Sequence, residues 1–398
     1  MNPSVVVIGG GIAGVSAAYE LVQAGCAVIL LEGEAVLGSH STGRSAALYF
    51  ENYGASPNRG LTRASRPFFD TPPDDLVDHP LLEKRGAMWI GTPAQEPLLR
   101  AHLAESEAGS HPGRWLGPSQ ARALVPVLRL EYLGGAVLEP EALDLDVAGL
   151  HQAFVRGFRR AGGEVRVSAP VTGLERAGSP WTVIAGGDEI RADVVVNAAG
   201  AWGDEIGVMA GAKPVGLVPM RRTAFTVPGD SAYRLWPLVA DADNQFYFRP
   251  DGTQLLCSLA EERASPPEDA RPDEVDIALA IERINEATTL GIRTVRASWT
   301  GLRTFVVDRA MVIGFDPRVE GFFWLVGQGG TGIQTAPAAA LLAAGLIATG
   351  SPPPALDRYD IDLAGLSPRR LTDGQISPST PPLSPGEAHG QSGSAGRS

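Results

Sequence analysis

The distribution of apolar residues near the N-terminus predicts a strand, a helix and a second strand in direct succession. Residues 5–8 form a continuous apolar run, as expected of a strand that is buried on both faces. Glycines follow, and residues 13–24 then have helical spacing up to Gly25. A second apolar run covers residues 27–31 and ends at Glu32. This order predicts a βαβ unit with two parallel strands.

Helical and strand-like patterns then alternate along the chain, which predicts a mixed α/β fold. Helical spacing covers residues 145–161, 274–288 and 332–348. Strand-like runs cover residues 164–167, 181–185, 194–197, 245–249, 254–259 and 322–326. Residues 51–141 show an irregular pattern with proline-rich turns. Residues 375–398 consist largely of Ser, Pro and Gly, which bury too little surface to fold, so they are predicted to be a disordered tail.

The glycines between the first strand and its helix match the pattern GxGxxG. Gly9 permits a tight turn, Gly11 lets a pyrophosphate approach the backbone, and Gly14 lets the helix pack closely on the strand. The N-terminus of the helix then offers N–H groups to the phosphates. Glu32 follows at the end of the second strand, where it is placed to bind ribose hydroxyls. These features predict a dinucleotide site.

A second glycine cluster, at residues 327–332, also fits this pattern. The apolar helix after it runs into Pro352, and no second strand ending in an acidic residue follows. We therefore expect its helix N-terminus to stabilise negative charge on a ligand such as a reduced flavin. The chain then binds one dinucleotide and has no evident nicotinamide site.

Composition argues against several classes of function. The net charge of −12 disfavours binding to nucleic acid. Two cysteines, Cys26 and Cys257, and scattered histidines provide neither a disulfide framework nor a metal site. We expect no signal peptide, because the first residues include no basic segment, and no run approaches the roughly 18 apolar residues of a membrane span. We expect a cytoplasmic protein that acts on a small molecule.

Several segments resemble the D-amino acid oxidase superfamily of FAD enzymes, in the right order. They are the first glycine motif, residues 195–202, residues 301–303 and the second glycine cluster. Residues 40–47, 64–70 and 332–335 are most similar to D-arginine dehydrogenase-like proteins. The resemblance covers roughly residues 5–371.

The resemblance implies a Rossmann-like FAD-binding domain interleaved with an antiparallel-sheet substrate domain. The FAD-binding domain would take residues 1–50, 142–215 and 305–371. The substrate domain would take residues 51–141 and 216–304. Because Cys257 falls in the substrate domain, away from the last FAD segment, noncovalent FAD is expected.

The glycine motifs and the resemblance together assign a set of residues to FAD. They are Gly9, Gly11, Ile12, Ala13, Gly14, Glu32, Ser41, Thr42, Arg44, Ser45, Ala46, Ala47, Val171, Ala199, Gly200, Trp202, Gly329, Gly330, Thr331, Gly332 and Ile333. Within the loop at residues 41–47, Arg44 and Ser45 are the best candidates for contacts with the phosphates or the ring.

The resemblance also implies the residues that hold an amino acid substrate. A carboxylate calls for a planar, bidentate cation, and Arg303 matches the arginine that fills this role in the family. Arg222 is a second candidate, with its neighbour Arg221 as the alternative. Tyr53 and Tyr247 match tyrosines that donate to the same carboxylate.

Two further features complete the predicted site. The backbone carbonyl of Gly332 is expected to receive the substrate amine. The side-chain pocket is assigned to Leu48, Phe50, Glu51 and Ala87. Ala87 stands where an arginine dehydrogenase should carry an acid, which favours a neutral, apolar or aromatic side chain. Glu51, in a possible lid at residues 48–54, is the residue that could instead reach a cationic substrate.

The main interpretation is oxidation of a D-amino acid to the imino acid, by hydride transfer from Cα to flavin N5. The alternative is a substrate of the N-methyl, cyclic or other secondary amine type. Sarcosine oxidases place a lysine by the flavin, and neither Lys84 nor Lys213 lies in a matching segment. A flavin hydroxylase fed by NADPH and a regulatory flavin-binding subunit are less well supported. The electron acceptor, oxygen or a quinone-type compound, stays open.

Overall fold

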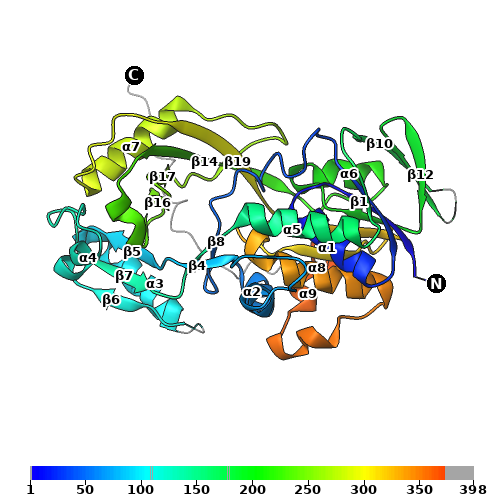
Figure 1. Ribbon diagram of the computed structural model, residues 1–398, viewed down its shortest axis with the longest axis horizontal. Coiled ribbons are helices and arrows are strands. Elements are labelled where there is room, and N and C mark those ends of the chain that lie inside the picture. The colour runs from blue at the N-terminus through cyan, green and yellow to red at the C-terminus, as the bar shows by residue number, and fades with distance from the viewer. Residues whose placement is uncertain (1, 108, 110, 177, 179, 373–398) are drawn as a thin grey trace, which may run out of the picture.

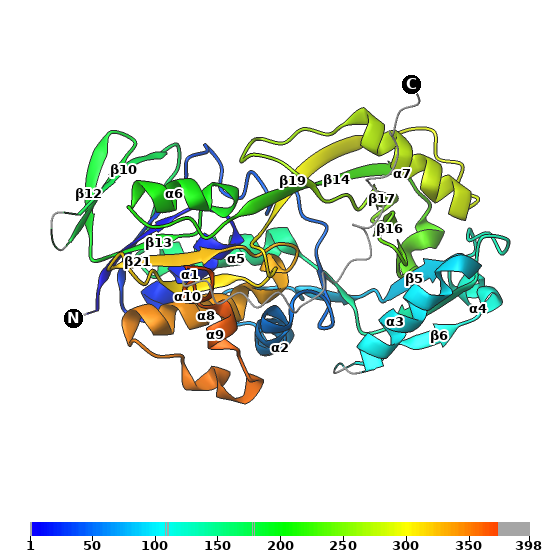
Figure 2. The same cartoon turned by 180° about the vertical axis from the view of Figure 1, so that it is seen from behind.

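A computed structural model describes residues 2–107, 109, 111–176, 178 and 180–372 of the chain. The molecule is elongated, and its two halves lie side by side (Figure 1). Two long, paired strands, β14 (Val218–Pro228) and β19 (Ala297–Phe305), run from one half into the other. The view from behind shows the same arrangement (Figure 2). The predicted tail at residues 375–398 lies outside the described residues.

One half is built on a mainly parallel sheet. Its strands, in spatial order, are β20 (Val312–Phe315), β21 (Phe322–Val326), β13 (Val194–Asn197), β1 (Ser4–Ile8), β2 (Ala27–Leu31) and β9 (Glu164–Arg166). Val5 and Val7 face one hydrophobic core, and Val6 and Ile8 face another. Both faces of β1 are therefore buried, which explains the continuous apolar run in the sequence.

Different elements cover the two faces of this sheet. On one face lie the helices α1 (Ile12–Gln23), α5 (Val147–Arg160) and α8 (Gly332–Ala348). On the other lie a small antiparallel sheet of β10 (Val171–Glu175), β11 (Trp181–Ala185) and β12 (Asp188–Ala192), and the helix α6 (Gly203–Met209). These layers give the Rossmann-like arrangement that the glycine motif predicts.

The other half is built on a large, mostly antiparallel sheet. Its strands, in order, are β18 (Arg263–Ala264), β14, β17 (Gln254–Ser258), β16 (Tyr247–Asp251), β15 (Leu238–Asp241), β5 (Ala87–Gly91), β7 (Gly135–Glu139) and β6 (Arg114–Leu116). Alternating residues face opposite ways. Phe225 and Phe248 pack in the core under α7 (Glu274–Ala287), whereas Ala224 and Tyr247 form a separate cluster on the opposite face.

The region at residues 51–141, predicted to be irregular, contains helices that the sequence analysis missed. They are α2 (Ser56–Asp70), α3 (Glu96–Glu107) and α4 (Pro118–Leu124). Gly60 and Pro67 lie inside α2, and both residue types disfavour a helix interior. Leu61 and Phe69 of α2 belong to the same core as α8, although the predicted domain limits assign this stretch to the substrate domain.

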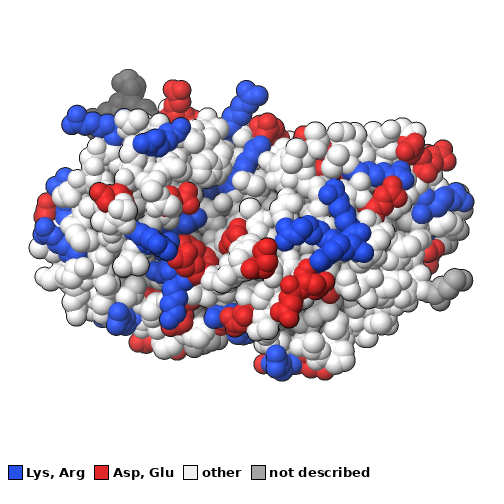
Figure 3. Space-filling view, in the orientation of Figure 1, with Lys and Arg blue, Asp and Glu red and all other residues white. Residues whose placement is uncertain are grey.

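Short strands join the two halves. β3 (Leu48–Tyr49), β8 (Leu143–Leu145) and β4 (Leu82–Lys84) form a small sheet at this junction. Charged side chains of both signs are interspersed over the face of the molecule seen in Figure 3. Among the residues that the structure describes, no helix is both long enough and apolar enough to cross a membrane.

Glu20 on α1 supplies a test of this packing. Burial raises the pKa of Glu20 to about 7, above its ordinary value of 4.5. The folded state therefore binds this proton more tightly than the unfolded state, and ionisation costs stability as the pH rises from 4.5 through 7. We expect Glu20→Gln to raise the free energy of unfolding by about 1–3 kcal/mol at pH 8.5, at 1.36 kcal/mol per pKa unit.

The gain should nearly vanish near pH 4.5, where the glutamate is protonated in the folded state and about half protonated in the unfolded state. Urea unfolding of the parent and the variant at both pH values measures the difference. An equal effect at the two pH values would contradict burial of an ionisable carboxyl here.

Candidate active site

An elongated cavity of about 640 Å³ is lined by residues of both halves of the molecule. At one end lie Glu32 and Val171, beside the glycine loop that follows β1. At the other end lie Arg222 and Arg303, on β14 and β19, with Trp89 of β5. The carboxyl ends of the parallel strands thus open into a space that reaches the large antiparallel sheet, as in other dinucleotide folds.

The glycine loop has the geometry of a phosphate-binding turn. Gly9 has a φ of +113°, and a Cβ there would lie 2.4 Å from the carbonyl oxygen of Ala198. A Cβ on Gly14 would lie 1.8 Å from the carbonyl oxygen of Gly9. Only glycine fits at either place. Gly14 itself does not line the cavity, so its function is to let α1 pack close to β1.

The peptide of Gly10 is held on both sides. Its N–H donates to Glu32 Oε2 (2.8 Å), and Glu32 Oε1 accepts from the N–H of Glu34 (2.9 Å). The carbonyl oxygen of Gly10 lies 2.9 Å from Nε2 of His151 on α5. Burial lowers the pKa of His151, so its neutral ring donates this hydrogen bond. His151 was not predicted as a site residue; a histidine inside a helical pattern gives no signal of such a contact.

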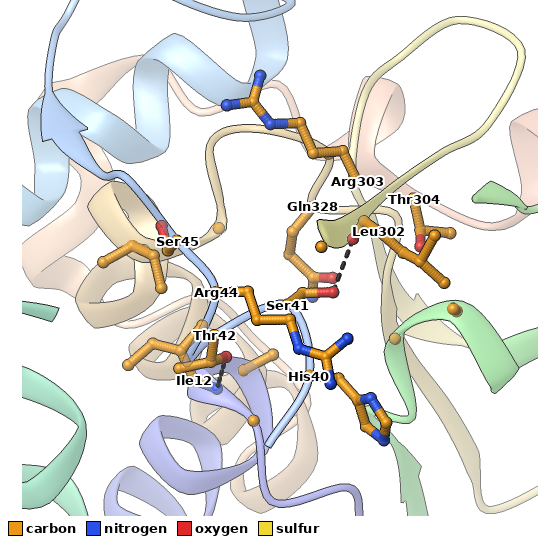
Figure 4. Close-up of a pocket in the computed structure, with 18 of the residues that line it drawn as sticks. Ile12, His40, Ser41, Thr42, Arg44, Ser45, Leu302, Arg303, Thr304 and Gln328 are labelled. Atoms are coloured by element: carbon orange, nitrogen blue, oxygen red, sulfur yellow. Dashed lines mark hydrogen bonds between the residues drawn. The ribbon is translucent and has the colours of Figure 1, made fainter. Parts of the chain in front are cut away.

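The loop at residues 40–47 closes over the start of α1 (Figure 4). Thr42 Oγ1 accepts from the N–H of Ile12 (3.0 Å), and Ser41 Oγ donates to the carbonyl of Leu302 (2.6 Å). The loop therefore joins the glycine motif to β19, which carries Arg303.

Arg44, predicted to contact the FAD phosphates or ring, lines the cavity, but its charge is bound by groups of the protein. Its guanidinium donates to the carbonyls of Ala270 (3.1 Å) and Thr300 (3.0 Å) and pairs with Asp269. Because its guanidinium is bound by these partners, Arg44 anchors the loop to β19 and to the segment around Asp269. Ser45 lines the cavity and stays the candidate for a cofactor contact.

Arg303 points into the cavity at the end opposite His40 (Figure 4). Its Nη1 donates to the hydroxyl of Tyr53 (3.2 Å). Within the described part of the chain, no carboxylate lies within ion-pair distance of Arg303. A guanidinium that is largely shielded from water and has no paired anion is costly, so this geometry favours an anionic ligand here.

Arg222 is the inward residue of the arginine pair on β14, because alternate residues of a strand face opposite sides. Arg221 binds a glutamate on the other face. Nε of Arg222 donates to the carbonyl of Glu261 (2.8 Å), and its Nη2 to Glu262 Oε1 (3.2 Å). Burial, together with the nearby charge of Arg303, lowers the pKa of Arg222. Arg222 thus has a direct ion pair within the protein, whereas Arg303 interacts with Glu261 and Glu262 only at longer range.

Next to these arginines, mostly apolar side chains form a space that we call the apolar chamber. It is lined by Leu48, Phe50, Ala87, Trp89, Ala224, Leu238, Ala240, Phe246, Tyr247 and Ala260. Several of these residues are alanines, which leaves room for a substrate group. The acidic residues among the described lining of the whole cavity are Glu32 and Glu34, just after β2, and Glu205 on α6, all in the half that carries the glycine loop. Met88, the neighbour of Trp89 on β5, is fully buried on the opposite face of the sheet. Only Trp89 of these two residues therefore lines the chamber.

The predicted lid is tied to the neighbouring elements. The N–H of Phe50 donates to Gln334 Oε1 (2.9 Å), and Gln334 Nε2 donates to the carbonyl of Phe50 (3.2 Å). The assignment of Glu51 to the substrate pocket is wrong, because Glu51 does not line the cavity. Its carboxylate accepts from the hydroxyl of Tyr49 (2.9 Å) and faces a separate surface hollow beside Arg63.

Two predictions at the second glycine cluster also need correction. Thr331 is buried and does not line the cavity; its hydroxyl donates to the carbonyl of Gln328 (3.0 Å). Gly332 lines the cavity, but it begins α8, where carbonyl groups point along the helix away from its N-terminus. Gly330 precedes the helix, and a Cβ on it would lie 2.6 Å from the hydroxyl of Tyr53. Gly330 also lines the cavity, so its carbonyl is a second candidate to receive an amine.

The other predicted residues all line this one cavity. They are Gly9, Gly11, Ile12, Ala13, Glu32, Ser41, Thr42, Ser45, Ala46, Ala47, Leu48, Phe50, Tyr53, Ala87, Val171, Ala199, Gly200, Trp202, Arg222, Tyr247, Arg303, Gly329, Gly330 and Ile333. The sequence analysis missed Ala224, Ala240 and Ala260, because a buried alanine in a strand carries no sign of its function.

Comparisons with known proteins place the chain in a family. The sequence profile described as "FAD dependent oxidoreductase" matches residues 4–346. The chain is 27% identical to mitochondrial dimethylglycine dehydrogenase of Mus musculus over 63% of its length and 30% of that protein. It is 26% identical to mitochondrial sarcosine dehydrogenase of Homo sapiens over 90% of its length and 41% of that protein. The chain thus spans less than half the length of these relatives.

A solved structure agrees in fold. The crystal structure of glycine oxidase from Geobacillus kaustophilus superimposes with a TM-score of 0.77 at 22% identity, over 87% of this chain and 95% of that one. The glycine loop, the carboxylate of Glu32 and the length of the cavity all suit a dinucleotide.

Proposed function

Because the chain belongs to the family of FAD-dependent oxidoreductases, we propose that it oxidises the C–N bond of an amino acid whose nitrogen is alkylated or part of a ring. The relatives named for dimethylglycine and sarcosine support this alternative better than the D-amino acid interpretation. The observation that carries the proposal is Arg303, a cavity-lining guanidinium that binds Tyr53 and has no carboxylate partner among the described residues.

In this proposal, Arg303 and Tyr53 bind the substrate carboxylate. Arg303 keeps donors free for a bidentate contact, and the hydroxyl of Tyr53, which accepts from Arg303, can donate its own proton. Tyr247 lines the cavity beside both arginines. The carbonyl of Gly330 receives the N–H of a secondary amine. These contacts orient the carbon next to the nitrogen.

FAD, when bound, supplies the redox chemistry by accepting a hydride from that carbon. The protein's part is to orient the substrate and to exclude water, which the aromatic rings of Phe50, Trp89 and Tyr247 do at the chamber. No titratable base is needed if the amine binds in its neutral form. The acidic residues that line the cavity lie in the half with the glycine loop, and the large antiparallel sheet contributes Ala87, Trp89, Ala224 and Ala240, which favours an uncharged, apolar substituent over a cationic one.

Anaerobic flavin reduction tests the proposal. We expect bleaching near about 450 nm, the flavin absorption band, with sarcosine, L-proline and N-methyl-L-leucine. N-methyl-L-leucine should reduce the flavin faster than sarcosine does, because it fills the apolar chamber. D-leucine, D-phenylalanine and D-arginine serve as comparisons.

A fastest reduction by D-leucine or D-phenylalanine would restore the D-amino acid interpretation. Fastest reduction by D-arginine would contradict the neutral chamber. Mixing the reduced protein with oxygen or with a quinone then identifies the acceptor class.

A further inference from the structure

Glu139, the last residue of β7, lies behind the cavity wall rather than in the cavity. Its side chain is 3% exposed. Oε1 accepts from the indole N–H of Trp89 (3.2 Å), and Oε2 accepts from Nδ2 of Asn52 (2.8 Å). Nε2 of His102, on α3, lies 2.6 Å from Oε1. One buried carboxyl group thus contacts side chains from three separate segments.

The partners of Glu139 belong to two different walls of the substrate site. Trp89 lines the apolar chamber from β5. Asn52 sits in the lid next to Tyr53, whose hydroxyl accepts from Arg303. A shift of Asn52 would therefore move Tyr53 relative to the carboxylate anchor, and a shift of Trp89 would widen the chamber. Glu139 joins these two positions through a single rigid group.

The chemistry of the contacts requires a carboxylate. Nδ2 of Asn52 donates both to Glu139 Oε2 and to the carbonyl of His111 (3.2 Å), so a flipped amide would place an oxygen against two acceptors. The indole N–H of Trp89 can only donate. Glu139 must therefore accept on both oxygens. A glutamine would direct its NH₂ group at one of these donors and break that contact.

We propose that Glu139 is a positioning residue for the reaction, because it holds the Trp89 wall and the Asn52–Tyr53 lid at a set distance across the substrate. This inference takes its substrate from the proposed function, but the contacts of Glu139 on which it is built do not depend on that function. Glu139 does not touch substrate or cofactor; it acts through Trp89 and Asn52.

The test compares Glu139→Gln, Asn52→Leu and the double variant as FAD-loaded proteins. The substrate is the amino acid that reduces the parent fastest. We expect each single variant to lower the limiting rate of flavin reduction roughly 10- to 100-fold, the cost of a displacement of about 1 Å at the reacting groups. The double variant should lose less than the product of the two single losses, because both changes act on one connected set of hydrogen bonds around Glu139.

Asp241→Asn is the matched control. Asp241 is as buried as Glu139 and lies on β15, which pairs with β5, the strand of Trp89. It accepts from Gln95 Nε2 (3.1 Å) and Tyr132 Oη (3.4 Å), but it does not line the cavity. The Asp241→Asn variant should be less stable than the parent, but its flavin should be reduced at the same rate. Fully additive losses in the double variant, or an equal loss of rate in Asp241→Asn, would overturn the positioning role.

A binding probe separates this inference from the proposed function. Benzoate, an aromatic carboxylate, should perturb the flavin spectrum of the parent and bind roughly 10-fold more weakly to Glu139→Gln and to Asn52→Leu. This result supports the role of Glu139 even if no N-alkyl amino acid reduces the flavin. If Glu139→Gln does not fold, Trp89→Phe removes the same indole donor and must show the same weakening; an unchanged affinity in Trp89→Phe and Asn52→Leu would overturn the inference.

Discussion

Arg303→Met should lower kcat/KM for the amino acid substrate roughly 1,000-fold, about 4 kcal/mol, because it removes one partner of a buried charge pair. Arg303 is the cavity-lining cation that no described carboxylate neutralises, so a substrate carboxylate is its natural partner. Arg222 cannot replace it, since its Nε and one Nη are already bound to Glu261 and Glu262.

Stopped-flow reduction under anaerobic conditions measures this effect directly. The apparent dissociation constant should rise, and the limiting rate should fall because the substrate is no longer aligned. Arg221→Met is the matched control: it removes a neighbouring, largely buried arginine that faces away from the cavity. Equal losses in the two variants would mean that Arg303 is structural, and an unchanged rate in Arg303→Met would refute the anchor.

Gly14→Ala should abolish FAD binding. The added Cβ would lie 1.8 Å from the carbonyl oxygen of Gly9, and backbone atoms at both positions leave no room for adjustment. α1 must therefore move away from β1, and its N-terminal N–H groups leave the phosphate position. We expect the purified variant to contain less than about a tenth of the flavin of the parent, because each 1.4 kcal/mol of lost binding is a factor of ten.

Flavin content per chain, from absorbance after acid precipitation, checks this prediction. The same measurement on the parent tests noncovalent attachment: all the flavin should appear in the supernatant, since Cys257 is buried in the core of the large sheet, where burial raises the pKa of its thiol. Gly60→Ala on α2 is the control, because a Cβ there meets only ordinary contacts from 3.5 Å. Full flavin content in Gly14→Ala would contradict the assigned loop geometry.

Local sequence patterns predicted the parts of the fold that depend on neighbouring residues. Helix α8 and the strands β11, β13 and β21 lie where their apolar periods place them. Helix α2 was missed because Gly60 and Pro67 weaken its local signal, and packing against α8 stabilises it instead. Tertiary contacts can override local propensity in this way.

The amino-acid sequence by itself therefore specified the dinucleotide loop, the family and the presence of Arg303 in the cavity, because each depends on a short motif whose chemistry is local. The cavity's specificity depends on residues that are far apart in the chain. Ala240 and Ala260 become a chamber only when their strands pair, Glu51 turns out to face a different hollow, and Glu139 meets Asn52 across 87 positions. Such contacts follow from strand register and side-chain direction, which no local pattern encodes.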